Sequence, residues 1–394
     1  MNQETKAFIA KNERSDIFKL SLQFKVESNV DLDLAIRQIN GKQKIKLKVP
    51  SFFLNDEILY PVQLSLEQSS SETTANYKSS LCEGNTLVDL TGGFGIDCCF
   101  MSKHFKQVVY VERQAELCEL ATHNYKILKK NHIQVVHAET EKYLVEMNNA
   151  DWIFIDPARR NSSGKKVVLL SDCEPDIGIL SSVLLQKANR VMIKLSPMMD
   201  ITAALKNLPN TTEIHILSID NECKEVLLIL NQEKHSNQKI TTINFGKNNK
   251  KEEVFMFWKD EESSAQVEFA SGVEKYMYEP NSSIMKSGAF KLIASRFDIC
   301  KLHKNTHLYT SNKLILDFPG RIFEVQNQWG NTNKEHKELV NKIPKANICV
   351  RNFLLSVDEL RKKLKIKEGG DAYLFACTLA DEKKVIIECK KHVI

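Results

Sequence analysis

The chain has 394 residues, 42% hydrophobic and 27% charged, with a net charge of +5, which is ordinary for a soluble globular protein and long enough for several domains. No stretch approaches the roughly 18 consecutive apolar residues of a membrane span, and the charged start MNQETKAFIAKNERSD lacks the pattern of a signal peptide. The ten cysteines form no C-x-x-C pair or zinc-ligand cluster, so we expect a reducing, cytoplasmic setting and no structural metal.

Residues 1–75 are expected to form a mostly helical N-terminal domain. Asp31–Ile39 has the apolar spacing of a helix, and Gly41 could end it. Over residues 42–48, four lysines alternate with apolar residues, so an extended conformation would place four ammonium groups on one face. A solvated edge is the simpler interpretation. The polar stretch LEQSSSETTANYKSS (66–80) leads into the next domain.

From residue 85 the pattern changes to short apolar runs separated by helix-length segments. The runs are TLVDL, QVVYVE, IQVVHAE, DWIFID and RVMIKLS. Strands that are buried on both faces are apolar throughout, so this alternation predicts a parallel sheet with helices on both sides. We expect this α/β domain to cover residues 76–235.

A glycine-rich turn follows the first of these strands, in TLVDLTGGFGID (86–97). The strand ends in Asp89, and a helix is expected over residues 96–105. Glycines allow the backbone to approach a ligand closely, and the helix would point its positive end into the turn. The second strand ends in Glu112, 23 positions after Asp89, where this class of fold places a carboxylate that binds ribose hydroxyls. A nicotinamide enzyme would show the same spacing, but the glycine order does not fit G-x-G-x-x-G.

The third and fourth strands also end in polar residues. Glu139 follows the third strand, and Asp156-Pro157-Ala158-Arg159-Arg160 follows the fourth, at the sheet edge where ligands bind in open α/β folds. The two arginines could clamp a phosphate or a carboxylate. The alternative is that Asp156 forms a buried structural pair with one of them. Lys194 follows the fifth strand at the same edge and could face the substrate or simply be exposed.

The rest of the chain is expected to form two small α+β domains, a β-rich one over 236–320 and an α/β one over 321–394. The first should contain strands over 240–245, 253–258 and 265–269. The second should contain a helix over 357–364 and strands over 372–378 and 384–388. Residues 321–394 hold 15 Lys and Arg against 10 Asp and Glu, which is the entire excess of positive charge. A basic run within this segment, including Lys362 and Lys363, could follow an RNA backbone or form a solvated helix end.

Two motifs carry a resemblance to known enzymes. Asp-x-Thr-Gly-Gly-Phe-Gly resembles motif I of class I S-adenosylmethionine (SAM) dependent methyltransferases, which have a Rossmann-like sheet. Asp156-Pro157 resembles the start of the Asp-Pro-Pro-aromatic motif of amino-methyltransferases, in which the Asp holds the target amine. Ala158 and Arg159 depart from that motif, because the second proline and the aromatic residue that would stack on a flipped base are both absent. The resemblance implies cofactor contacts from Asp89, Thr91, Gly92, Gly93, Gly95, Asp97, Glu112, Arg113 and Glu139.

Over most of its length the chain resembles bacterial, Bacteroidetes-type class I methyltransferases that carry a ferredoxin-like insert and a C-terminal THUMP-like domain. DLTGGFGID, IDPARR, KLSP and EQSSSETTANYK cover the methyltransferase part, YMYEPNSSIMKSGAF the insert, and RNFLLSVDELRKKLKIKEGGDAYLFA the tail. In such enzymes the segment just before motif I often closes over the methionine end of the cofactor. In this chain that segment holds Gln68, Ser70, Thr73 and Lys78, and an ordinary polar linker is the alternative. THUMP domains are associated with RNA, particularly tRNA.

The leading hypothesis is therefore a SAM-dependent methyltransferase that acts on a base nitrogen of tRNA or rRNA. Asp156 and Pro157 are its candidate catalytic residues, and RNA contacts are expected from Arg159, Arg160, Lys194, Lys362 and Lys363. A methyltransferase for a protein or small molecule is the second hypothesis, and a non-catalytic RNA-binding protein is the third. A nicotinamide oxidoreductase is a distant fourth.

Overall fold

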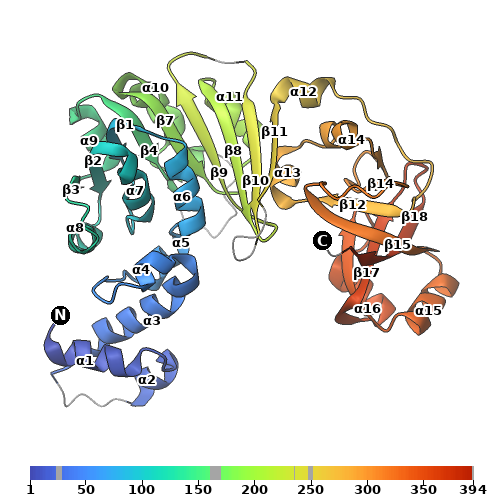
Figure 1. Ribbon diagram of the computed structural model, residues 1–394, viewed down its shortest axis with the longest axis horizontal. Coiled ribbons are helices and arrows are strands. Elements are labelled where there is room, and N and C mark those ends of the chain that lie inside the picture. Colours follow the sequence, from blue (N-terminus) through green and yellow to red (C-terminus); the bar gives the residue numbers. More distant parts are fainter. Residues whose placement is uncertain (24–28, 160–169, 235, 247–251, 393–394) are drawn as a thin grey trace. The chain divides into compact units, whose positions relative to one another are not determined.

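The computed structural model describes residues 1–23, 29–159, 170–234, 236–246 and 252–392 (Figure 1). The chain divides into two compact units, one of residues 1–212 and 226–236 and the other of residues 213–225 and 237–394. The α/β fold with a parallel sheet that the sequence predicts is confirmed. No helix in the described ranges is long and apolar enough to cross a membrane.

The segment before the first strand is helical. It contains α1 (Gln3–Asn12), α2 (Ile17–Gln23), α3 (Leu32–Lys48), α4 (Pro50–Phe53), α5 (Gln63–Gln68) and α6 (Glu72–Ser80). The expected helix end at Gly41 is wrong, because α3 continues to Lys48, and the lysines of residues 42–48 therefore lie on a helix and not on an extended strand. Gly41 is needed for packing, since a Cβ at this position would lie 2.3 Å from Cβ of Tyr60.

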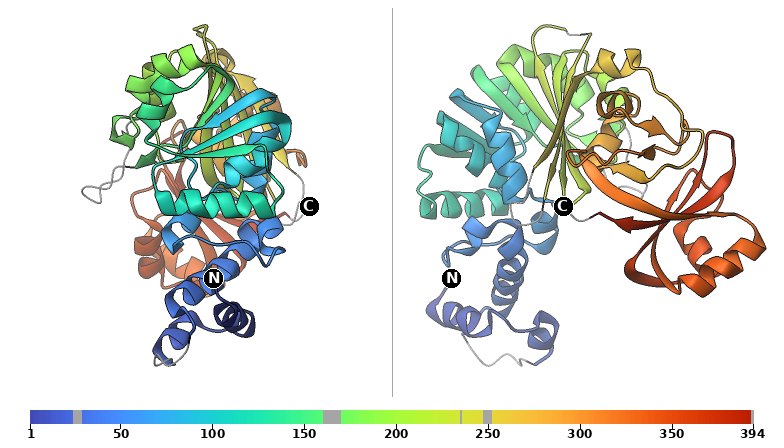
Figure 2. Two further views of the ribbon diagram at one scale, coloured as in Figure 1. Left: turned by 90° about the vertical axis from the view of Figure 1, so that its left-hand side faces the viewer. Right: turned by 45° about the vertical axis from the view of Figure 1, so that its right-hand side comes forward.

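A parallel sheet forms the centre of the first unit (Figures 1 and 2). Its strands pair in the order β7-β4-β1-β2-β3 and are β1 (Gly84–Asp89), β2 (Phe105–Glu112), β3 (Ile133–His137), β4 (Ala150–Ile155) and β7 (Ala188–Leu195). The last residues of β9 (Glu222–Asn231) run antiparallel beside β7. Ile153, Phe154 and Ile155 are all buried in succession, so both faces of β4 are covered.

Helices alternate with these strands along the chain. They are α7 (Ile96–Met101), the 3-10 turn η1 (Ser102–His104), α8 (Ala115–Ile127), α9 (Thr140–Glu146), α10 (Ile177–Lys187) and α11 (Ile201–Asn207). Between β4 and α10 lie a short antiparallel pair, β5 (Ala158–Arg159) with β6 (Cys173–Glu174), and the 3-10 turn η2 (Leu170–Asp172). Because the strands are parallel, the residues that follow β1, β2, β4 and β7 share one edge of the sheet.

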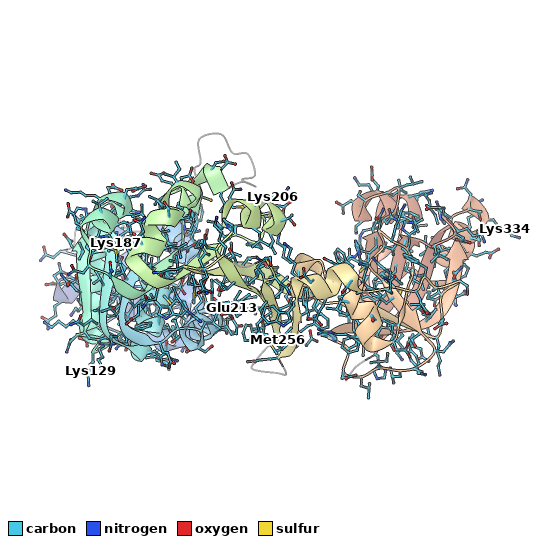
Figure 3. All side chains as sticks on the ribbon, turned by 90° about the horizontal axis from the view of Figure 1, so that it is seen from above. Lys129, Lys187, Lys206, Glu213, Met256 and Lys334 are labelled. Carbon is cyan, nitrogen blue, oxygen red and sulfur yellow. The ribbon has the colours of Figure 1, made fainter. Side chains whose placement is uncertain are left out.

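The second unit holds two groups of strands. In the first, β8 (Thr211–Ile219) is parallel to β10 (Lys239–Phe245), which pairs antiparallel with β11 (Glu253–Trp258). Alternate residues of β11 differ in burial: Phe255 is buried, whereas Met256, labelled in Figure 3, is exposed. The expected strand over 265–269 is wrong: these residues follow α12 (Lys259–Ser264), and their only ladder pairing in the described residues is one isolated bridge between Phe269 and Lys301.

The second group is a seven-stranded sheet with the order β13-β14-β12-β15-β18-β17-β16. Its strands are β12 (Tyr276–Pro280), β13 (Cys300–Lys301), β14 (Tyr309–Ser311), β15 (Gly320–Gly330), β16 (Lys345–Arg351), β17 (Lys367–Thr378) and β18 (Lys384–Lys391). The accompanying helices are α13 (Ser282–Ser287), α14 (Leu292–Phe297), α15 (Asn333–Lys342) and α16 (Val357–Leu364). The helix expected over 357–364 and the strands expected over 372–378 and 384–388 are thus confirmed.

Candidate active site

The turn between β1 and α7 is shaped by close contacts that only glycine permits. A Cβ at Gly92 would lie 2.1 Å from the ring of Tyr110, and one at Gly95 would lie 2.4 Å from the hydroxyl of Tyr125. Gly95 also has a φ of +83°, a conformation that other residues rarely adopt. The two tyrosine hydroxyls donate to backbone carbonyls of the same turn, at Gly93 and Gly95. The turn is therefore held tightly against β2 and α8.

Glu112, the last residue of β2, lies directly beside this turn. Its Oε2 accepts a hydrogen bond from the backbone N–H of Gly93 at 2.9 Å, and its Oε1 accepts one from Gln114 at 2.9 Å. The carboxylate is thus oriented by backbone donors at the edge of the sheet. Each oxygen keeps a further lone pair. A fixed carboxylate next to a glycine turn fits a nucleoside with free ribose hydroxyls.

Asp89 ends β1 beneath the turn and is almost fully buried. Its Oδ1 accepts a hydrogen bond from the backbone N–H of Thr91 at 3.0 Å. Burial raises the pKa of Asp89 well above its usual range, and three neighbouring carboxylates add to the rise, those of Asp97, Asp156 and Glu112. The acidic residues that the sequence placed at separate strand ends therefore sit within one electrostatic environment.

Asp156 follows β4 and is fixed at two points. Its backbone N–H donates to Oγ1 of Thr91 at 2.6 Å, and its side-chain Oδ2 accepts from Nζ of Lys194 at 2.5 Å. The first bond ties the Asp-Pro segment to the glycine turn, and the second ties it to the end of β7. The Asp156 side chain is 35% exposed, whereas the next residue, Pro157, is buried. The sheet edge thus presents one partly exposed carboxylate beside the turn.

Asp156 is the end of a set of linked polar and charged side chains that we call the buried network, formed by Ser70, Lys78, Asp97, Lys194 and Asp156. Oγ of Ser70 donates to Oδ2 of Asp97 at 2.7 Å, and Nζ of Lys78 lies 3.2 Å from Oδ1. Nζ of Lys194 is 3.5 Å from Oδ2 of Asp97. Burial alone would raise the pKa of Asp97, but the two ammonium groups outweigh it and hold that pKa below its usual value.

Other predicted site residues lie outside this cluster. Arg113 forms an ion pair with Glu174 at 2.8 Å, with both side chains about half exposed, and Glu139 is exposed at the start of α9. Arg159 belongs to β5, where it pairs with Cys173, and Arg160 lies outside the described residues. The contacts that the sequence assigns to these residues stay predictions.

Lys362 and Lys363 belong to the second unit. Both are exposed in the last turn of α16, which begins with a capping box formed by Ser356 and Glu359. Within the first unit, the structure brings together Asp89, Thr91, Glu112 and Asp156 with the glycine turn. The RNA contacts expected of the two lysines stay predictions.

Several residues that shape the site were not singled out from the sequence. Tyr110 and Tyr125 follow the apolar pattern of a strand and a helix, so their roles beneath the turn are invisible there. Lys78 was weighed only as part of a cofactor-covering segment or a linker, yet it is completely buried. A buried lysine is rare, and nothing in the local pattern of α6 marks this one.

The strand order and this arrangement of turn and strand ends define the class I methyltransferase fold. Two family models match the second unit, one for a ferredoxin-like domain at residues 276–319 and one for a THUMP domain-like module at residues 320–391. A crystal structure from Porphyromonas gingivalis W83, described as a methyltransferase, is 32% identical, with coverage of 99% of this chain and 98% of that one and a TM-score of 0.88.

The chain therefore belongs to the family of class I, SAM-dependent methyltransferases that carry a ferredoxin-like insert and a C-terminal THUMP-like domain. A second relative is the tRNA (uracil(54)-C(5))-methyltransferase of Pyrococcus horikoshii, which is 26% identical over 167 residues. That match covers 41% of this chain and 40% of the relative, so the chain spans about two fifths of that enzyme's length.

Proposed function

We propose that the protein transfers a methyl group from SAM to a nitrogen atom of an RNA base. The observation that carries this proposal is the position of Asp156. It lies at the sheet edge, its backbone is bonded to Thr91 of the glycine turn at 2.6 Å, its carboxylate is partly exposed, and the residue after it is a buried proline. A cofactor cradle and a hydrogen-bond acceptor for a substrate nitrogen are thus adjacent.

The residues around the turn fit SAM. Glu112 would accept hydrogen bonds from the ribose hydroxyls. Its carboxylate oxygens have lone pairs available for this beyond those that accept from Gly93 and Gln114. The glycine turn would allow the cofactor to approach the backbone closely, and Glu139 would contact the adenine. When bound, SAM supplies an electrophilic methyl group and leaves as S-adenosylhomocysteine.

Asp156 supplies orientation in this mechanism. Its Oδ1 would accept an N–H hydrogen of the substrate base, which directs the nitrogen lone pair toward the methyl carbon. As the new N–C bond forms, the nitrogen loses that proton to the carboxylate or to water. Pro157, a buried residue with a fixed backbone φ, would keep the segment after Asp156 rigid. Direct displacement depends mainly on proximity and alignment.

RNA as the substrate is supported by two of the comparisons. One is the THUMP domain-like match at residues 320–391, and the other is a relative whose name is that of a tRNA methyltransferase. Arg159 and Arg160 would contact a phosphate beside the site, and Lys362 and Lys363 would contact the RNA backbone from the tail.

Two measurements test the proposal. Calorimetric titration with SAM and with NADH should show binding of SAM, and Glu112→Ala should weaken it. Tritiated-methyl transfer to total bacterial RNA and to total bacterial protein then separates the substrates. Label in protein and not in RNA would favour a methyltransferase that acts on proteins. Absence of SAM binding would overturn the proposal.

A further inference from the structure

The buried network runs from the interior of the first unit to the proposed catalytic carboxylate. Ser70 lies just before α6, Lys78 within α6, Asp97 in α7, Lys194 near the end of β7 and Asp156 after β4. The order of contact is Ser70 and Lys78 to Asp97, Asp97 to Lys194, and Lys194 to Asp156. Segments that are far apart in the sequence are therefore connected to one carboxylate through Lys194.

Exposure of the charged side chains increases along this network and is greatest at its last member. Lys78 is fully buried, the side chains of Asp97 and Lys194 are 10% and 11% exposed, and that of Asp156 is 35% exposed. Buried ion pairs contribute little net stability, because removing the charges from water offsets their attraction. Since an apolar cluster could fill the same space, stability alone does not explain these charges. We therefore look for their role at the exposed carboxylate of Asp156.

Lys194 restricts the carboxylate of Asp156 to one orientation. Its ammonium bonds Oδ2 at 2.5 Å while the backbone of Asp156 is bonded to Thr91 at 2.6 Å. Oδ1 accepts no hydrogen bond from the parts of the chain that the structure describes. Because Lys194 binds Oδ2 and Thr91 holds the backbone of Asp156, the direction of Oδ1 is fixed.

We propose that Lys194 is a positioning residue for methyl transfer: anchored by Asp97, it holds Oδ2 of Asp156 so that Oδ1 faces the substrate nitrogen. This inference rests on the proposed function, because it requires Asp156 to bind the nucleophile. Lys194 acts here through Asp156 and does not touch the substrate. The direct substrate contact expected of Lys194 from the sequence is the competing role, and the two roles predict different kinetics.

The test measures single-turnover methyl transfer to total bacterial RNA by the full-length protein, with SAM affinity from calorimetry and thermal melting as a check of folding. Lys194→Met should lower the rate constant about 100-fold, the size of loss expected from a misplaced reacting group. SAM affinity and the half-saturating RNA concentration should stay unchanged. Lys194→Arg, which keeps the charge, should restore part of the rate.

A matched control is Lys187→Met. Lys187 also donates to two acceptors in the same unit, the carbonyls of Val145 and Met147 at 3.2 and 2.7 Å, but it lies at the end of α10, before β7 begins. This variant should keep the wild-type rate. Asp97→Asn should cause a smaller loss than Lys194→Met and should lower the rate no further when added to it, since both act through one carboxylate.

Several outcomes would overturn the inference. They are a wild-type rate in folded Lys194→Met, a raised half-saturating RNA concentration with an unchanged rate constant, and additive losses for Asp97→Asn and Lys194→Met. If Lys194→Met does not fold, Asp97→Asn decides: a reduced rate at unchanged SAM affinity supports the inference, and a wild-type rate overturns it. Asp156→Ala keeps the two proposals apart, because wild-type transfer by that variant would refute the catalytic assignment itself.

Discussion

Replacing Lys78 by methionine should destabilise the first unit far more than an ordinary lysine substitution. Nζ of Lys78 lies 3.2 Å from Oδ1 of Asp97 and 3.1 Å from Oγ of Ser70, and the side chain is fully buried. Removing one partner of a buried ion pair costs about 3–5 kcal/mol, because the other charge is left without compensation. Lys194 still faces Asp97 at 3.5 Å, so we expect a value near the lower end, about 3 kcal/mol.

The assay is urea denaturation followed by circular dichroism, and Lys44→Met is the control. Lys44 pairs with Glu67 at 2.8 Å, but these side chains are 37% and 52% exposed, so the control should lose at most about 1 kcal/mol. Adding Asp97→Asn to Lys78→Met should recover part of the loss, because the uncompensated charge disappears. The reasoning is refuted if Lys78→Met costs no more than Lys44→Met, or if the second substitution adds a further full loss.

The ion pair of Lys78 with Asp97 should also make the free energy of unfolding depend on pH. The pKa of Asp97 is lower in the folded protein than its usual value, so its ionised form stabilises the fold above the unfolded pKa of about 4, and this contribution is lost as the pH falls through the folded pKa. The stability of the wild type should therefore decline on acidification below about pH 4. Lys78→Met should show a shallower decline, since one of the two cations that lower this pKa is gone.

The remaining predictions concern the turn and the tail. Glu112→Ala should weaken SAM binding about 100-fold in calorimetry, since two charge-assisted bonds to ribose are lost; unchanged affinity would contradict the cofactor assignment. Asp89→Asn should raise the free energy of unfolding at pH 7, because burial raises the pKa of Asp89, and the gain should vanish below about pH 4, where this carboxyl is protonated in both states. A loss of stability at neutral pH would refute that sign. Gly92→Ala should cost about 1–3 kcal/mol of stability through overpacking, and a neutral effect in thermal melting would speak against the close contact. Replacing Lys362 and Lys363 by alanine should reduce the salt dependence of RNA binding by about 1.4 in log–log slope, whereas an unchanged slope would mean that neither contacts phosphate.

Much of the fold follows from local patterns in the sequence. Apolar runs identified β1, β2, β3, β4 and β7, because strands covered on both faces have no polar alternation. The rule that parallel strands end at one edge then places the residues after β1, β2 and β4 near one another, as the structure has them. Local patterns also predicted α16 and the late strands of the tail.

The features that could not be predicted from the sequence depend on contacts between distant segments. Gly41 looked like a helix end because glycine commonly follows one, but its real constraint is Tyr60, whose side chain leaves no room for a Cβ. Lys78 and Lys194 lie 116 positions apart and meet around Asp97 only because α6, α7 and β7 are packed together. No local pattern distinguishes a lysine buried in this way from a solvated one.

The most direct test of the central claim is to identify the methylated nucleoside. Total bacterial RNA, labelled by the wild type and by Asp156→Ala with tritiated SAM, would be digested to nucleosides and separated. We predict label in an N-methylated nucleoside with the wild type and none with Asp156→Ala, while SAM affinity is retained. Label on a base carbon, or labelling that survives the substitution, would contradict the account.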